Sequence, residues 1–122
     1  MSKYTIIFFF ILSSCYELER DCATFKTGFF ESEILINNAL YKSTFKRYDN
    51  LQIEFFDGQI DSLSIRWIND CEMIFKSINP KNKYEKKNIH IKILSTTENS
   101  YKYEYGYPGE SIKRKGIAKR VD

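Results

Sequence analysis

The chain has 122 residues, with 19 lysines and arginines against 16 aspartates and glutamates, a formal net charge of +3. This length predicts one small domain, and so small an excess of positive charge is a weak signature of nucleic-acid binding. No nucleic-acid partner is therefore expected. The sequence has one histidine, no grouping of His, Cys, Asp and Glu with metal-ligand spacing, and no glycine-rich phosphate loop, so neither a metal nor a cofactor is expected.

Residues 1–14 have the pattern of a secretory signal peptide. One positive charge, Lys3, precedes an apolar run from Tyr4 to Leu12, which is too short for a membrane span of roughly 20 residues. The residues Leu12-Ser13-Ser14-Cys15 resemble the lipobox of bacterial lipoproteins. That resemblance implies cleavage before Cys15, a diacylglycerol on its sulfur and a fatty acyl group such as palmitate on its amine. Multiple acyl chains anchor a protein stably to a membrane.

Two alternatives to the lipoprotein interpretation stay open at this point. In the first, Cys15 is an ordinary thiol of a secreted protein; in the second, the apolar run is a buried strand. The lipoprotein interpretation is preferred and places the protein in the bacterial cell envelope. It leaves the choice between inner and outer membrane undecided.

After residues 1–14, the sequence predicts a tether over 15–21 and a single domain over 22–122. An exported protein meets an oxidising compartment, so Cys22 and Cys71 are expected to form a disulfide. The enclosed loop of roughly 50 residues corresponds to about 4 kcal/mol in the chain-entropy model.

Turn-forming pairs divide the domain into short segments rich in aromatic and β-branched residues. The pairs are Asn37-Asn38, Asp49-Asn50, Asp57-Gly58, Asn69-Asp70, Glu98-Asn99 and Pro108-Gly109, and a longer polar interval runs from Asn79 to Asn88. These seven interruptions leave eight segments, most of which alternate between apolar and polar residues. Period two with frequent turns predicts antiparallel strands and an all-β fold.

The alternation also predicts faces and registers. In LQIEF, Leu51, Ile53 and Phe55 are expected to face the core, with Gln52 and Glu54 opposite. A two-residue turn at Asn37-Asn38 pairs Ile34 with Tyr41 and Phe30 with Phe45. At Asp57-Gly58 a three-residue bulged turn that includes Gln59 is expected, because it pairs Ile53 with Leu63. Gly28 is expected to mark a bend or bulge.

Eight sequential antiparallel strands around one core most simply close into an up-and-down barrel, with a two-sheet β-sandwich as the alternative. The bulky inward candidates make the interior look crowded: Phe30, Tyr41, Phe45, Phe55, Trp67, Phe75, Tyr103 and Tyr105. The opening residues CATFKTGFF loosely resemble the start of lipocalin-like proteins, which implies a barrel able to hold one small ligand.

Further segments, DCATFKTGFF, SIRWINDCEMIF and NPKNKYEKKNIHIKIL, together with the lipobox, resemble a set of short uncharacterised lipoproteins of the Bacteroidota. Members of that set often carry the label of DNA topoisomerase IV. Such a label would be an error for this chain, because the sequence has no room for an ATPase or DNA-gate domain and its signal directs it out of the cytoplasm.

The residues that could carry chemistry do not predict an enzyme. His90 lies opposite the isoleucines of its strand and is expected to be exposed, whereas a nucleophile pair needs it in a cleft. The carboxylate pairs Asp57/Asp61 and Asp70/Glu72 lie at turns and strand ends, where solvated acids are common.

Several residues have both a ligand-binding and a structural interpretation. Trp67 could stack a ligand together with Arg66, but packing against the disulfide is preferred. The tyrosines Tyr101, Tyr103 and Tyr105 line a cavity or fill it, and filling is preferred. The basic C-terminal IKRKGIAKRVD reads as a solvated strand protected by charge, with binding to anionic lipid or a polyanion as the alternative.

The function expected from these features is a non-catalytic envelope lipoprotein that acts as a protein-interaction or assembly module. The alternative is a lipocalin-like binder of a small apolar or amphipathic ligand, and an open interior would favour it.

In an up-and-down barrel, one end carries Cys22, Cys71 and Trp67. The disulfide is expected to close this end, which is expected to face the membrane. The opposite end carries the 79–88 loop, where Lys81, Lys83, Lys86 and Lys87 form a candidate partner site or a merely solvated loop.

Overall fold

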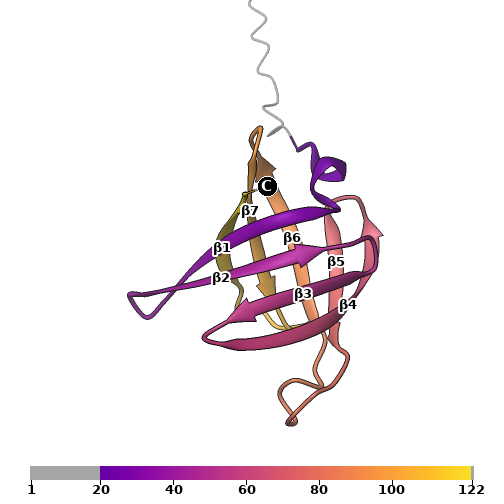
Figure 1. Ribbon diagram of the computed structural model, residues 1–122, viewed down its shortest axis with the longest axis vertical. Coiled ribbons are helices and arrows are strands. Elements are labelled where there is room, and N and C mark those ends of the chain that lie inside the picture. The colour runs from indigo at the N-terminus through magenta and orange to yellow at the C-terminus, as the bar shows by residue number, and fades with distance from the viewer. Residues whose placement is uncertain (1–19, 122) are drawn as a thin grey trace, which may run out of the picture.

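The computed structural model describes residues 20–121, so the predicted signal peptide and Cys15 lie outside the described residues. A short 3-10 helix, η1 (Cys22–Phe25), precedes eight strands (Figure 1). The strands are β1 (Gly28–Ile36), β2 (Ala39–Arg47), β3 (Leu51–Phe56), β4 (Gln59–Asn69), β5 (Glu72–Ser77), β6 (Ile89–Thr96), β7 (Ser100–Gly106) and β8 (Arg114–Arg120).

The eight strands form a closed antiparallel barrel in sequential order, and β8 pairs with β1 to close it. The predicted up-and-down barrel is thus confirmed, and the sandwich is excluded. The predicted two-residue turn at Asn37-Asn38 is also confirmed, since both asparagines have positive φ, 52° and 66°. This turn pairs Ile34 with Tyr41 and Phe30 with Phe45, as expected.

The predicted facing of β3 was wrong. Asp57 and Gly58 have φ values of 52° and 77°, the geometry of a tight two-residue hairpin that follows the natural strand twist. Ile53 therefore pairs with Ser62 and not with Leu63. Since Leu63 faces the interior, a shift of one residue reverses the faces of β3. Gln52 is 2% exposed inside the barrel, whereas Phe55 is 38% exposed outside it.

Tyr41 was also wrongly assigned to the interior. It is 44% exposed, although its partner across the ladder, Ile34, lines the inner wall. The reason is the length of the β1–β2 hairpin, whose tip projects beyond the rest of the barrel (Figure 1). Residues 39–42 lie in the exposed part of β2. An inward-pointing position there has no opposite wall to pack against.

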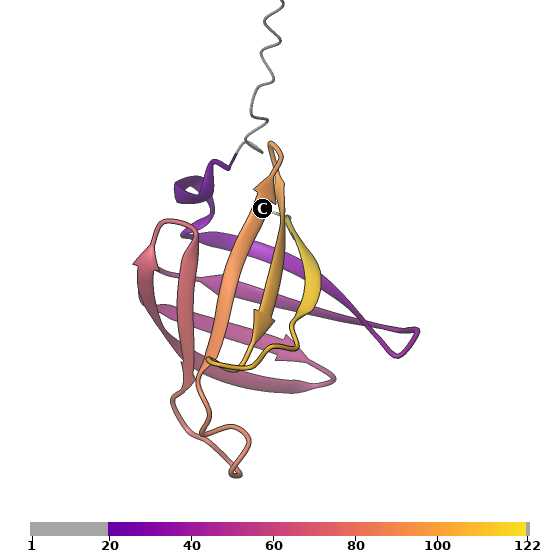
Figure 2. The same cartoon turned by 180° about the vertical axis from the view of Figure 1, so that it is seen from behind.

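The two ends of the barrel differ. One end carries η1, the 70–71 turn and the 97–99 turn, and the opposite end carries the 37–38 and 57–58 turns, the 78–88 loop and the 107–113 loop (Figures 1 and 2). Cys22 and Cys71 are joined by a disulfide, as predicted. They lie at the η1 end with Trp67, and the 78–88 loop lies at the other end, as the strand count predicted.

Aromatic packing fills the η1 end. Phe25 of η1 is 1% exposed and lies with its ring centroid 5.2 Å from that of Tyr101. Phe30 and Phe45 stack beneath it with a centroid separation of 5.1 Å. The helix η1 therefore acts as a plug, and we call this end the closed end and the opposite end the open end.

Gly28 begins β1 at a φ of 139°, a value that favours glycine. A Cβ at this position would clash with Nη1 of Arg120. Arg120 in turn donates to the carbonyl oxygens of Thr24 and Thr27, which fixes the chain between η1 and β1. The predicted bend at Gly28 is thus the point where the plug joins the barrel wall.

Candidate functional site

The barrel interior is filled at the closed end and hollow toward the open end. The hollow is a cavity of about 170 Å³. Its apolar wall comes from Ile34, Phe45, Leu63, Phe75, Ile89 and Ile91, and its polar wall from Ser32, Ser43, Arg47, Gln52, Glu54, Tyr101, Tyr103 and Tyr105. An apolar wall facing a few convergent polar groups is the usual composition of a small-molecule site.

A chain of hydrogen bonds runs from the closed end of the barrel to this cavity. Nε of Arg47 donates to Oε1 of Gln52 at 2.8 Å, and Nε2 of Gln52 donates to Oε1 of Glu54 at 3.2 Å. Because the Gln52 oxygen is occupied by Arg47, its NH₂ group is the end that faces Glu54. The carboxyl group of Glu54 therefore accepts a hydrogen bond at the cavity wall.

Arg47 also lines the cavity and is 3% exposed. Its Nη1 donates to the carbonyl oxygen of Phe25 at 3.0 Å, and its Nη2 donates to the Tyr101 hydroxyl at 2.9 Å. Five aromatic rings lie within about 6 Å of the guanidinium carbon, those of Phe30, Phe45, Trp67, Phe75 and Tyr101. Such contacts stabilise a desolvated cation. Arg47 thus holds the plug against the barrel.

The surroundings of Glu54 disfavour the charged form of its carboxyl group. Burial raises its pKa, the hydrogen bond from Gln52 lowers it, repulsion from Asp61 raises it and Arg47 lowers it, with a net rise. Glu54 and Asp61 are paired across the β3–β4 ladder, so both side chains lie on the inner face. Asp61 lies 3.9 Å from Nζ of Lys81, a partly exposed pair. Two carboxyl groups therefore stand beside each other near the open end.

On the opposite side of the cavity, Tyr103 and Ser32 hydrogen-bond through their hydroxyls at 2.5 Å. Burial raises the pKa of Tyr103 far above its ordinary value, so the phenol is neutral. Gly116 makes room for it, since a Cβ on Gly116 would lie 2.6 Å from the Tyr103 hydroxyl. This wall offers neutral hydroxyl groups.

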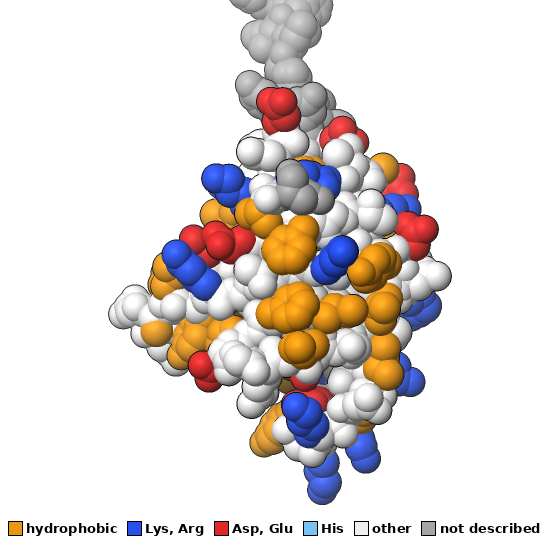
Figure 3. All heavy atoms as spheres, in the orientation of Figure 1, with side chains coloured by type: hydrophobic (Ala, Val, Ile, Leu, Met, Phe, Trp, Pro, Cys, Tyr) orange, Lys and Arg blue, Asp and Glu red, His pale blue; other side chains and the backbone are white. Residues whose placement is uncertain are grey.

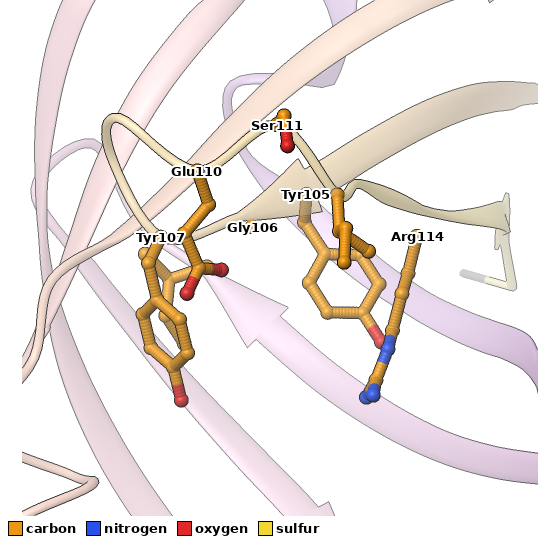
Figure 4. Close-up of a pocket in the computed structure, with 8 residues that line it drawn as sticks. Tyr105, Gly106, Tyr107, Glu110, Ser111 and Arg114 are labelled. Atoms are coloured by element: carbon orange, nitrogen blue, oxygen red, sulfur yellow. The ribbon is translucent and has the colours of Figure 1, made fainter.

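A second hollow of about 600 Å³ lies beside the 107–113 loop at the open end. It shares Ile89 and Tyr105 with the inner cavity, so the two hollows adjoin. Figure 4 shows Tyr107 and Glu110 next to each other on the loop, and Tyr105 beside Arg114. Tyr105 and Arg114 are also partners in the β7–β8 ladder. We call this second hollow the mouth.

All three tyrosines singled out in the sequence border the inner cavity, and one of them also fills the barrel interior at the closed end. Tyr101 is 2% exposed and fills the closed end. Tyr103 and Tyr105 line the inner cavity, and Tyr105 also lines the mouth.

Trp67 packs against the core at the closed end together with Cys22 and Cys71, and its Nε1 donates to the carbonyl oxygen of Asp49 at 2.8 Å. Arg66 is exposed on the outer face, so it does not form a ligand-stacking pair with Trp67. The geometry of Trp67 matches the structural interpretation that the sequence favoured.

The lysines of the predicted partner loop lie at the open end. Lys81 approaches Asp61, and Nζ of Lys87 lies 5.0 Å from the ring centroid of Tyr107 in the mouth. Lys83 and Lys86 are exposed. The loop therefore adjoins the mouth, and its role in binding a partner stays a prediction.

His90 lies on the outer face of β6 with its Nε2 2.9 Å from Oε2 of Glu72. Its side chain is 21% exposed, so it is more enclosed than the sequence predicted. The hydrogen bond from His90 lowers the pKa of Glu72. Among the carboxylates that the sequence places at turns and strand ends, Asp57 lies in the tight turn and Asp70 pairs with Lys26 at 2.8 Å.

Within residues 20–121, no three His, Cys, Asp or Glu side chains are grouped so as to hold a metal ion. None of the helical segments in that part of the chain is long and apolar enough to cross a membrane. Comparison of the chain with protein-family models, curated proteins and solved structures finds no match.

Proposed function

We propose that this protein is a non-catalytic binder of a small amphipathic molecule, which it holds in the open half of the barrel. The observation that carries the proposal is the inner cavity, which has an apolar wall and a polar wall and adjoins a wider mouth. A cavity of about 150 Å³ is enough for benzene, and ligand pockets typically measure about 300–1,000 Å³. The inner cavity suits one ring or short chain, and the mouth suits the remainder of a ligand.

The proposal reverses the preference that the sequence gave. A crowded interior favoured a protein-interaction module, and that expectation counted Tyr41 and Phe55 among its eight bulky inward residues. Both are exposed instead, and the polar side chains Gln52 and Glu54 occupy the inner face of β3. Polar groups on the inner face of β3, in place of the expected aromatic ring, support a ligand site inside the barrel.

A membrane anchor and an envelope location belong to the same proposal. The described chain starts beside the closed end, where Arg20 donates to the carbonyl oxygen of Ile93 and the Asp21 amide donates to Thr96. Seven residues separate Cys15 from Cys22, a distance of at most about 25 Å when extended. A lipid on Cys15 would hold the closed end near the membrane and leave the mouth free. Membership of the Bacteroidota lipoprotein set is part of this proposal.

A protein-interaction role is the second candidate, and a specific surface favours it. Apolar side chains gather over the outer face of β1–β4 (Figure 3), where the register places Phe29, Leu51, Ile53, Phe55 and Ile60. We call this surface the outer wall. Contiguous exposed apolar surface of this kind often marks a binding partner.

Native mass spectrometry of the protein purified from its own cells tests the two candidates. The wild type is expected to carry a small molecule, and Ser43→Phe, which adds a ring in the inner cavity, is expected to lose it. Phe55→Ser on the outer wall is the matched control and should keep it. Loss of a co-purifying protein from Phe55→Ser, with no small molecule on any variant, would instead support the interaction role.

A further inference from the structure

The polar groups of the inner cavity differ in what they can offer a ligand. Arg47 is the cation that lies toward the closed end of the cavity, but its N–H donors are directed to Gln52, Phe25 and Tyr101. Its charge is further enclosed by aromatic rings. A ligand carboxylate entering from the mouth would meet Glu54 before it met this guanidinium.

Glu54 and Arg47 are the charged residues that line the cavity, and the described part of the chain gives Glu54 no ion-pair partner. Within residues 20–121, no lysine, arginine or histidine nitrogen lies within ion-pairing distance of its carboxylate. Its neighbours are Gln52 on its own strand, Arg47 on β2, Asp61 on β4 and the Tyr103 phenol on β7. A buried carboxylate normally requires an opposite charge or several hydrogen-bond donors.

The remainder of the cavity suits the body of an organic cation. The rings of Phe75, Tyr103 and Tyr105 and the side chains of Leu63 and Ile91 form the walls near Glu54. Aromatic rings attract cations through their faces, and aliphatic side chains accept an apolar body. The arrangement combines one acceptor carboxylate with apolar walls.

We infer that the inner cavity binds a primary amine in its protonated form, with the ammonium group on Glu54 and a ring or short chain against Phe75 and Ile91. The inference rests on the proposed function and deepens it by specifying the chemistry of the ligand. The bound ammonium gives Glu54 an ion-pair partner, which residues 20–121 do not provide, and relieves its repulsion with Asp61. The aliphatic or aromatic body fills a volume near that of one benzene ring.

Three probes of one shape test this inference: benzylamine, benzyl alcohol and benzoate. Their dissociation constants are measured by ligand-observed NMR titration at neutral pH with the full-length protein purified from its own cells. Benzylamine is expected to bind at least about tenfold more tightly than benzyl alcohol, because a charge-assisted hydrogen bond is stronger than a neutral one. Benzoate is expected to bind most weakly.

Two substitutions locate the effect. Glu54→Gln keeps the shape and the hydrogen bond to Gln52, and should weaken benzylamine about tenfold while leaving benzyl alcohol unchanged. Glu31→Gln, an outward position on β1, is the matched control and should leave every probe unchanged. Thermal unfolding of each variant verifies that the barrel is folded.

The possible failures are distinguishable. Equal or tighter binding of benzyl alcohol or benzoate, abolished by Ser43→Phe, would overturn the amine inference and leave the binding function standing. An unchanged benzylamine affinity in Glu54→Gln would also overturn it. Binding of none of the probes to the wild type would contradict both the inference and the proposed function.

Discussion

The guanidinium of Arg47 donates a 2.9 Å hydrogen bond to the hydroxyl of Tyr101, which joins β2 to β7 through the interior of the barrel. The two residues are 54 positions apart in the chain and both are buried. The same guanidinium contacts the plug through Phe25 and reaches the cavity through Gln52. Arg47 thus connects the plug at the closed end to the polar side chains of the inner cavity.

Tyr101→Phe is expected to destabilise the barrel by about 1–3 kcal/mol, because it leaves a buried Arg47 donor without its acceptor while keeping the ring in place. Urea unfolding followed by tryptophan fluorescence measures the loss. Tyr84→Phe is the control, because Tyr84 is 73% exposed, and it should leave the midpoint unchanged. A wild-type midpoint for Tyr101→Phe would show that the hydrogen bond contributes nothing to stability.

The disulfide between Cys22 and Cys71 attaches the plug to the start of β5. The double substitution Cys22→Ala/Cys71→Ala is expected to lower the free energy of unfolding by about 2–5 kcal/mol, the typical cost of removing a native disulfide from a small domain. Urea unfolding of the double variant against the oxidised wild type measures it. Mass mapping under non-reducing conditions should find the linked peptide, and free thiols at both positions would contradict the pairing.

Gly116→Ala should destabilise the barrel by about 1–3 kcal/mol, the usual cost of overpacking a filled interior. The new Cβ would lie 2.6 Å from the Tyr103 hydroxyl and 3.1 Å from the carbonyl oxygen of Glu33. Combining it with Tyr103→Leu removes the first clash, so a double-mutant cycle should show favourable coupling. Strictly additive effects would mean that the Tyr103 ring moves aside without cost.

The overall fold was predictable because its signals are local. Turn pairs separate the strands, and the positive φ values at Asn37 and Asn38 fit residues that tolerate that conformation. Sequential antiparallel strands then leave few arrangements besides a closed barrel. The position of the disulfide followed from the same count, since Cys22 precedes β1 and Cys71 precedes β5.

The inner face of β3 was not predictable from its own residues, because LQIEF alternates equally well in either direction. Assigning the apolar set inward is the usual choice, but it ignores what stands opposite. Arg47 shares the inner face of β2 with Phe45, and it pairs directly with Gln52. A buried guanidinium needs acceptors more than another apolar contact. The overlooked signal was a charged residue two positions after an inward phenylalanine.

Cys15→Ser tests the proposed anchor, which lies outside the described residues. Cells grown with a clickable fatty acid are expected to label the wild-type protein, and the substitution should abolish the label because it removes the thiol proposed to carry the diacylglycerol. Cys22→Ala/Cys71→Ala controls for acylation at other cysteines and should still be labelled. Full labelling of Cys15→Ser would contradict the lipoprotein proposal.

Glu54→Gln is expected to stabilise the ligand-free barrel at neutral pH but not in acid. Burial and Asp61 raise the pKa of Glu54 against the opposing effects of Gln52 and Arg47. The folded state therefore holds the Glu54 proton more tightly than the unfolded chain, whose glutamate pKa is about 4.3. The stability that this provides is present below that pH and is lost as pH rises through the higher folded pKa. Glutamine does not titrate and avoids this loss.

The urea midpoint of Glu54→Gln relative to wild type should therefore rise as pH increases from the unfolded pKa through the higher folded-state pKa of Glu54. Glu72→Gln provides a control of opposite sign, since its hydrogen bond with His90 lowers the pKa of Glu72. Its carboxylate stabilises the fold above the unfolded pKa, so the substitution should lower the midpoint at neutral pH and have little effect in acid. A midpoint difference for Glu54→Gln that does not change with pH would show that Glu54 titrates in the folded state as it does in the unfolded chain.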